Sequence, residues 1–475
     1  PQLTNAVLVG QTHNASGNHS SIGGGRCNKL SSNCSYIGGG FQNTASAGCS
    51  FIGGGKENYV NNAGFVTIVG GCCNCIDGTN TTFSFIGGGQ KNCIIKTGGG
   101  GGTGGQELNV IAGGFCNSIS VYYGFCNFIG GGACNDITGL RGSVIVGGQN
   151  NTNSGTYAAI VTGQNNTISG YHSFIGSGCN NCVNAASRAA IVSGQGNCMG
   201  NACANHSIIG SGCNNCISSK CGVIVGGCCN CIAFQSAAIS SVVGGHCNCI
   251  NSCEGFIGGG HQNQVSKGMM SNTVGISVVG GCCNIACGNY SFIGGGCKNN
   301  ISCAACCSAV LGGLCNCITH DDAFVIGSCI TSAANCTTHI NNAIITGSLT
   351  VGCKTQLTTT VGRIDATNDV VAFSTSDKRL KCNIQPIDNA LCKVIGVSGN
   401  TFDWKELNEK ERKTIHGNTG RDVGVIAQEI ESILPEAVTT RDSGYKAVNY
   451  EKIIPLLIEA IKEQQKQIDE LKSRL

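Results

Sequence analysis

One asparagine register constrains this chain more than any other feature of its sequence. An asparagine lies six residues after an aliphatic residue nineteen times between Leu8 and Asn316, and the spacing between units is most often 15 residues. Three residues after the aliphatic residue stands a glycine in every unit except the first, which has Gln11. A short, fixed period of this kind is typical of stacked coils, because one coil cannot bury its apolar face alone. We therefore predict a mainly β, solenoid or β-roll fibre over residues 1–320.

The sequence of a single repeat indicates short strands joined by turns. In residues 288–301, Tyr290 and Phe292 alternate with small or polar neighbours, which is the periodicity of a strand. Ile293 begins a glycine run, which must turn the chain or allow close backbone approach. We expect Asn299 to tolerate left-handed backbone geometry, and the stacked asparagines to form side-chain hydrogen-bond ladders. Each unit is predicted to hold two short strands, two turns and no helix.

Composition divides the chain at about residue 375. Residues 1–375 carry 21 charged side chains and the last 100 residues carry 32, and no proline occurs between Pro1 and Pro386. Residues 321–375 lose the asparagine register but keep β-type residues such as Val351 and Val361. We interpret them as a β-rich neck, and residues 376–475 as a separate small α+β domain.

Charge and hydropathy exclude several classes of partner. The net charge is +3 and the last 100 residues hold 16 basic and 16 acidic side chains, so no basic patch suited to nucleic acid is present. No run of 18 or more apolar residues predicts a membrane span. We expect no nucleic acid, no membrane and no cofactor as partners.

Cysteine is abundant and falls in columns of the repeat. Of 37 cysteines, 35 precede residue 376. Stacked strands lie about 4.8 Å apart, inside the roughly 4.4–6.8 Å between Cα atoms that a disulfide tolerates. We predict disulfides between neighbouring coils or chains, with free thiols as an alternative. Candidates immediately before the repeat asparagine are Cys27, Cys73, Cys116, Cys134, Cys229, Cys247, Cys283 and Cys315, and those after it are Cys75, Cys93, Cys182, Cys198, Cys216, Cys231, Cys249 and Cys317.

Metal binding is the third interpretation of the cysteines. The CCNC clusters at 72–75 and 228–231 have thiols that zinc could use. The paired histidine and cysteine spacing of a closed structural zinc site is absent, so no metal site is expected.

The alternation of a GNYS-type turn with a SFIGGG-type strand, as in residues 288–296, resembles the head repeats of trimeric autotransporter adhesins. Related repeats occur in phage and viral fibre proteins. The resemblance covers roughly residues 5–320. It implies left-handed parallel β-rolls assembled as a homotrimer.

The last 100 residues carry a more specific set of motifs. SDKRLK at 376–381 is followed by GVIAQE at 424–429, LPE at 434–436, VNY at 448–450 and a closing IIPLLIEAIKEQQKQIDEL. In this order they resemble the intramolecular chaperone domain of phage endosialidase tailspikes, which brings three chains into register and then cuts itself off. The resemblance implies Ser376 as nucleophile, Lys381 as general base and a scissile bond at Ser376–Asp377 or immediately adjacent. An ordinary charged turn is the alternative interpretation of SDKRLK.

That chemistry is at most a single-turnover self-cleavage by a Ser/Lys dyad. A serine hydroxyl is a poor nucleophile until a base takes its proton, and a lysine can do so only as the neutral amine. Burial in an apolar trimer core favours the neutral amine, so assembly itself could switch the peptidase on.

The closing segment has the spacing of a coiled-coil seam. Its apolar positions recur at alternating steps of three and four residues. An amphipathic helix packed on its own domain is the alternative. The predicted seam residues are Ile454, Leu457, Ile461, Gln464, Ile468, Leu471 and Leu475.

Together these features predict a trimeric viral or phage-like fibre at the virion surface or in the extracellular space, with a host-surface glycan or receptor as possible partner. A glycan-degrading tailspike would need two nearby carboxylates, and residues 1–375 hold nine Asp or Glu, of which only Asp321 and Asp322 are adjacent. A bacterial surface adhesin is the other alternative, although no membrane-anchor strand pattern follows the repeats.

Overall fold

The computed structural model divides the chain into two compact units, residues 1–343 and 344–475, and each is considered by itself. The structure describes residues 7–8, 10–79, 81–96, 108–122, 125–200, 202–233, 239–266, 274–341, 376–405, 420–441 and 444–474.

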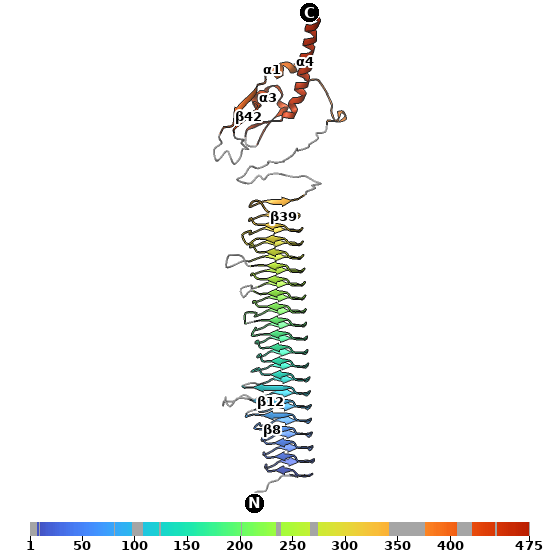
Figure 1. Cartoon of the computed structure of the whole chain (residues 1–475), viewed down its shortest axis with the longest axis vertical. Helices are drawn as coiled ribbons and strands as arrows, with labels where there is room; N and C mark the ends of the chain where they lie inside the picture. The colour runs from blue at the N-terminus through green and yellow to red at the C-terminus, as the bar shows by residue number, and fades with distance from the viewer. Residues whose placement is uncertain are drawn as a thin grey trace. The chain divides into compact units, whose positions relative to one another are not determined.

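The first unit is a stack of coils whose strands form two long parallel ladders (Figure 1). The first ladder contains the aliphatic residue of each repeat, and its strands pair in register, so that Ile37 lies between Ile22 and Ile52. Its 21 strands are β1 (Val7–Leu8), β3 (Ser21–Ile22), β5 (Tyr36–Ile37), β7 (Phe51–Ile52), β9 (Thr67–Ile68), β11 (Phe85–Ile86), β13 (Val110–Ile111), β15 (Phe128–Ile129), β17 (Val144–Ile145), β19 (Ala159–Ile160), β21 (Phe174–Ile175), β23 (Ala190–Ile191), β25 (Ile208–Ile209), β27 (Val223–Ile224), β29 (Ser241–Val242), β31 (Phe256–Ile257), β33 (Ser277–Val278), β35 (Phe292–Ile293), β37 (Ala309–Val310), β39 (Phe324–Ile326) and β40 (Thr338–Ile340).

The second ladder is made by the residues that follow each repeat asparagine. Ile76 pairs in register with Val60 on one side and Ile94 on the other. A third column, of single-residue bridges, runs from Gln11 to Leu314. The strands of the second ladder are β2 (Asn14–Ala15), β4 (Lys29–Leu30), β6 (Thr44–Ala45), β8 (Tyr59–Asn61), β10 (Cys75–Asp77), β12 (Cys93–Lys96), β14 (Ser118–Val121), β16 (Asp136–Ile137), β18 (Thr152–Asn153), β20 (Thr167–Ile168), β22 (Cys182–Val183), β24 (Cys198–Met199), β26 (Cys216–Ile217), β28 (Cys231–Ile232), β30 (Cys249–Ile250), β32 (Gln264–Val265), β34 (Ile285–Ala286), β36 (Asn300–Ile301) and β38 (Cys317–Ile318).

The core is a narrow apolar spine between the two ladders. Ile37 and Ile52 from the first ladder are fully buried, as are Leu30 and Val60 from the second. Each coil places only a few aliphatic side chains inside, so a coil is stable only when its neighbours cover it above and below. The mainly β, solenoid fold predicted from the register is confirmed.

The solenoid continues beyond residue 320, where its end was predicted. Strand β39 pairs in parallel with β37, and β40 pairs with β39. These strands join without the asparagine register, because backbone pairing is sufficient to extend the ladder. Residues 342–375 of the predicted neck lie outside the described residues.

The glycine that stands three residues after the repeat aliphatic residue is required by close coil-to-coil packing. Gly55 has φ +96°, and a Cβ atom built there would lie 2.1 Å from the Gly71 carbonyl oxygen of the next coil. At Gly54 the same atom would meet nothing within 4 Å. The two adjacent glycines therefore differ sharply in what they tolerate.

We expect Gly55→Ala to open the coils around residues 51–75, whereas Gly54→Ala leaves them closed. Backbone strain alone costs roughly 1–3 kcal/mol at such a position, and the clash with Gly71 adds to it. Amide hydrogen exchange followed by mass spectrometry would show faster exchange in this segment for Gly55→Ala only. Equal protection in the two variants would contradict this account of the packing.

The second unit is a small α+β domain. Its core contains Ala390, Leu456 and Ala460, with partly buried apolar residues of neighbouring elements packed around them. None of its described helices is long and apolar enough to cross a membrane. The elements are the 3-10 helix η1 (Lys378–Leu380), α1 (Ala390–Ile395), the antiparallel pair β41 (Gly399–Asp403) and β42 (Arg421–Val425), α3 (Ala427–Ile433), η2 (Pro435–Ala437), the antiparallel pair β43 (Val438–Thr440) and β44 (Lys446–Val448), η3 (Tyr450–Lys452) and α4 (Ile453–Arg474).

Candidate functional site

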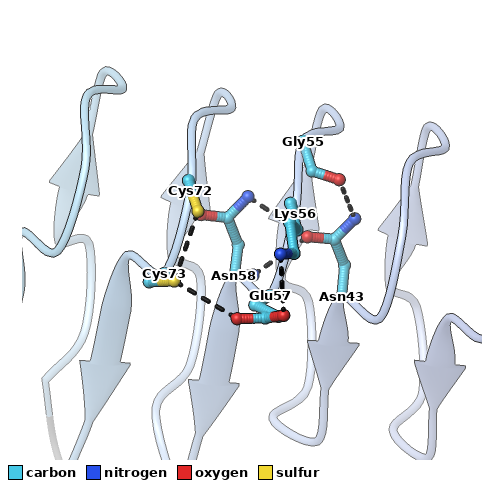
Figure 2. Close-up of polar contacts among 7 residues, drawn as sticks. All are labelled: Asn43, Gly55, Lys56, Glu57, Asn58, Cys72 and Cys73. Carbon is cyan, nitrogen blue, oxygen red and sulfur yellow. Dashed lines mark hydrogen bonds and ion pairs between the residues drawn. The ribbon is translucent and has the colours of Figure 1, made fainter.

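The repeat asparagines from Asn28 to Asn316 form a buried ladder along the solenoid, and Figure 2 shows Asn43 and Asn58 of this ladder. The Asn58 amide nitrogen Nδ2 donates to the carbonyls of Gly54 (2.9 Å) and Gly71 (3.0 Å) and to Oδ1 of Asn43 (3.1 Å). Its own Oδ1 accepts from the backbone N–H of Asn74 at 3.1 Å. Every polar atom of the buried side chain is thus satisfied, as a buried amide requires, and the predicted ladder is confirmed.

The left-handed position of the repeat is not the asparagine, so the expectation for Asn299 was wrong. The residue before the asparagine has positive φ instead, as at Lys298 (56°), Glu57 (55°) and Cys73 (57°). The turn is made one residue earlier, which leaves the asparagine free to direct its amide inward. As a result, two consecutive side chains meet on the outer edge, and Cys72 Sγ lies 3.2 Å from Cys73 Sγ (Figure 2).

The cysteine columns come together across the coils as the repeat predicts. In the column after the asparagine, Cys75 pairs in register with Cys93. A longer run of five consecutive strands stacks Cys182, Cys198, Cys216, Cys231 and Cys249. The structure therefore brings these cysteines to adjacent rungs.

Hydrogen bonds link the thiols of this run. The bond with Cys198 lowers the pKa of Cys216, and the bond with Cys216 raises the pKa of Cys231. A thiol whose pKa is lowered is the better nucleophile for disulfide exchange near neutral pH. Among the described residues the disulfide present joins Cys287 and Cys303, with Cα atoms 4.4 Å apart and a sequence separation of 16. Neither belongs to the predicted columns, whose members are free thiols, so disulfides there stay a prediction.

The predicted nucleophile and base are in direct contact. Lys381 Nζ donates a hydrogen bond of 2.6 Å to Ser376 Oγ, and both residues are exposed. The intervening η1 turn begins at Asp377, whose carboxylate accepts from the Arg379 backbone N–H at 2.8 Å and pairs with its guanidinium at 2.7 Å. The side-chain hydrogen bond from Arg379 is also the main reason why the pKa of Asp377 is lowered. This capped turn returns Lys381 to Ser376.

The direction of this hydrogen bond bears on the predicted Ser/Lys dyad. Lys381 is the hydrogen-bond donor to Ser376, whereas a general base must accept the serine proton. An exposed pair also competes with water.

The C-terminal motifs contact one another within the domain. Gly424 of the GVIAQE motif packs against Tyr450 of the VNY motif, since a Cβ at Gly424 would lie 2.7 Å from the tyrosine oxygen. Glu429 of the same motif accepts from the Ser398 N–H at 2.8 Å. These residues hold the sheet, α3 and η3 together.

Glu463 is a structural residue that the sequence reasoning missed. Its carboxylate accepts from the Leu391 N–H (2.8 Å) and the Ala390 N–H (2.9 Å), at the N-terminal end of α1. These backbone bonds lower the pKa of Glu463. The sequence offered only a glutamate within an amphipathic helix, and this pattern is too common to identify Glu463 in particular.

Helix α4 has two different apolar faces. Leu456 and Ala460 are buried against the α1 region. The predicted seam is exposed, with Ile454, Ile461 and Leu471 at 53%, 64% and 61% of their full accessibility. The helix therefore packs on its own domain and still leaves the three- and four-residue seam uncovered; Leu475 lies outside the described residues.

The sole adjacent carboxylate pair of residues 1–375 is engaged in a turn. Asp321 Oδ1 accepts from the Cys306 N–H at 2.6 Å, and Asp322 has φ 53°. Asp321 thus joins neighbouring coils, which is a structural role.

The chain combines a repetitive β-solenoid with a small terminal domain that carries a Ser–Lys pair and an uncovered helix seam. Residues 376–439 match the family chaperone of endosialidase, so the chain carries a domain of that family. Similar proteins include the long tail fiber protein Gp37 of Enterobacteria phage K3, 39% identical over 104 residues, which is 21% of this chain and 8% of the relative. The same protein of phage M1 is 39% identical over 112 residues, 23% of this chain and 42% of the relative. The chain spans less than half the length of these relatives.

Proposed function

We propose that this chain is a structural fibre protein of a phage or virus, assembled as a homotrimer by its C-terminal domain and used at the virion surface for host attachment. The proposal is supported by the relatives, which are named as long tail fiber proteins, and by the regular solenoid. The observation that carries it is the exposed seam of α4. A row of large aliphatic side chains at three- and four-residue steps is the surface that a second and third copy of the same helix would cover.

We further propose that assembly activates a single self-cleavage. Three α4 helices packed together would draw the attached domains close and exclude water from Ser376 and Lys381. As its proton passes to Lys381 Nζ, Ser376 Oγ would then attack the carbonyl carbon of the bond just before it, or that of the Ser376–Asp377 bond in a neighbouring chain, because attack on its own carbonyl would close a strained four-membered ring. The leaving amine would take that proton, and water would hydrolyse the resulting ester.

The cysteines that follow the repeat asparagine would reinforce the fibre by oxidation. Successive members of the run from Cys182 to Cys249 stand one coil apart, as do the bonded Cys287 and Cys303. We propose disulfides between neighbouring coils in this column. Their formation would constrain the unfolded chain and oppose local opening of the stack.

Light scattering during size-exclusion chromatography tests the assembly directly. We expect the mass of three chains of 48.3 kDa each, or of three shortened chains once cleavage has occurred. A single-chain mass at micromolar concentration would contradict the trimer. Attachment is tested by binding of the labelled trimer to host cells, with the C-terminal domain alone as control.

A further inference from the structure

Two clusters of cysteine and histidine side chains lie on the outer edge of the solenoid, at the one or two positions that precede the repeat asparagine. In the first, ligand atoms of Cys228, Cys229 and His246 all lie within 4.8 Å of one another. The two sulfurs are 3.4 Å apart. Cys247 approaches the same cluster, with its Sγ 3.6 Å from His246 Nε2.

The second cluster has the same types of ligand, but here the histidine precedes the two cysteines in the sequence. His261, Cys282 and Cys283 again hold their ligand atoms within 4.8 Å. The two sulfurs are 3.3 Å apart, and Cys282 Sγ is 3.7 Å from His261 Nδ1. The two clusters adjoin, because the rings of His246 and His261 stack with centroids 5.3 Å apart.

The repeat geometry explains why these ligands converge. Cys228, His246, His261 and Cys282 are successive members of one column of parallel bridges, so each lies beside the next. Cys229 and Cys283 follow in the left-handed conformation, with φ 57° and 56°. In an extended strand, consecutive side chains point to opposite faces, but this turn brings both vicinal sulfurs to the same edge.

The distances suit a tetrahedral cation with thiolate and imidazole ligands. Zinc–sulfur bonds of about 2.3 Å and zinc–nitrogen bonds of about 2.0 Å place tetrahedral ligand atoms roughly 3.5–3.8 Å apart. The observed separations of 3.3–3.7 Å are close to that range. Thiolate with imidazole is a donor set that favours zinc over magnesium or calcium.

We propose that the solenoid binds two zinc-class cations, one at Cys228, Cys229 and His246 and one at His261, Cys282 and Cys283. At the first site, the fourth position is left to solvent or to Cys247, whose Sγ lies 3.6 Å from His246 Nε2. At the second, the fourth position is left to solvent or to Gln262, whose Oε1 lies 3.5 Å from Cys283 Sγ. Each cation would join two neighbouring coils, and so clamp the stack without oxidation of its thiols.

Cobalt titration of the full chain tests the proposal. The protein is reduced with a phosphine, freed of reductant under nitrogen and titrated with Co²⁺, whose thiolate charge-transfer and visible bands report tetrahedral binding. We expect His246→Ala and His261→Ala each to remove about one equivalent of bound cobalt, and the double variant to remove both. Added Zn²⁺ should displace the cobalt and abolish the bands.

The vicinal pair Cys72 and Cys73 is the matched control, since its sulfurs are equally close, at 3.2 Å, but no histidine is part of a ligand cluster there. A Cys72→Ser, Cys73→Ser variant should keep both equivalents. The histidines are exposed, so circular dichroism should be unchanged in the alanine variants. Cobalt binding that is unaffected by both histidine changes, or that is lost in the Cys72/Cys73 variant instead, would overturn the proposal.

Discussion

Purified Ser376→Ala protein is expected to remain full length, whereas the unaltered chain releases a C-terminal fragment of about 100 residues. The alanine removes the oxygen that would attack the scissile carbonyl, and Lys381 cannot replace it in the same position. Denaturing gel electrophoresis and intact-mass spectrometry measure the outcome. Release of the same fragment by the Ser376→Ala chain would disprove the nucleophile.

Lys381→Met distinguishes a base from a structural contact. The methionine keeps much of the side-chain length but cannot accept a proton, so cleavage should slow by about 100- to 10,000-fold, the usual contribution of a general base. Lys378→Met, in the same exposed turn, should cleave at the normal rate.

Ile461→Asp is expected to convert the trimer into single chains. Ile461 is the most exposed of the described aliphatic residues in the α4 seam, at 64%, and burying such a side chain contributes about 1.5–3 kcal/mol per chain. The aspartate removes that term three times and places three carboxylates together in an apolar interface. Sedimentation velocity at micromolar concentration would show the loss of the trimer.

Lys466→Asp is the control for charge. Lys466 lies on the same exposed helix, between seam positions Gln464 and Ile468 but turned away from the seam by the three- and four-residue spacing. The Lys466→Asp protein should remain trimeric. If assembly activates the dyad, Ile461→Asp should also leave the chain uncleaved. An Ile461→Asp protein that is cleaved although it is a single chain would show that cleavage does not depend on assembly.

Much of the solenoid could be predicted because its rules are periodic. The buried Ile37 and the ladder of Asn43 follow from spacing alone, since an in-register stack repeats each environment. The position of the left-handed residue could not be fixed in this way. Asn299 and Lys298 are both compatible with a turn in sequence, and the choice depends on the inward hydrogen bonds of the asparagine.

The functional residues were less accessible to sequence reasoning. The Ser376–Lys381 pair came from a resemblance, because the contact depends on how Asp377 caps the intervening turn. For the cation clusters, the CCNC sequence at 228–231 marked two cysteines of the first one, but no motif marked the histidines. Their histidines and cysteines come from different coils, and coil length varies along the chain, so no fixed spacing marks them.

The asparagine ladder has one direction throughout. Asn43 N–H donates to Asn28 Oδ1, Asn58 N–H to Asn43 Oδ1, and the series ends where Ile330 N–H donates to Asn316 Oδ1. Each coil therefore donates a backbone N–H to the asparagine Oδ1 of the coil before it, and presents its own asparagine Oδ1 to the coil after it. The joints are interchangeable, so loss or duplication of a coil-sized segment would leave every remaining joint intact. Genetic change can therefore lengthen or shorten the solenoid by whole coils, in steps of about 4.8 Å.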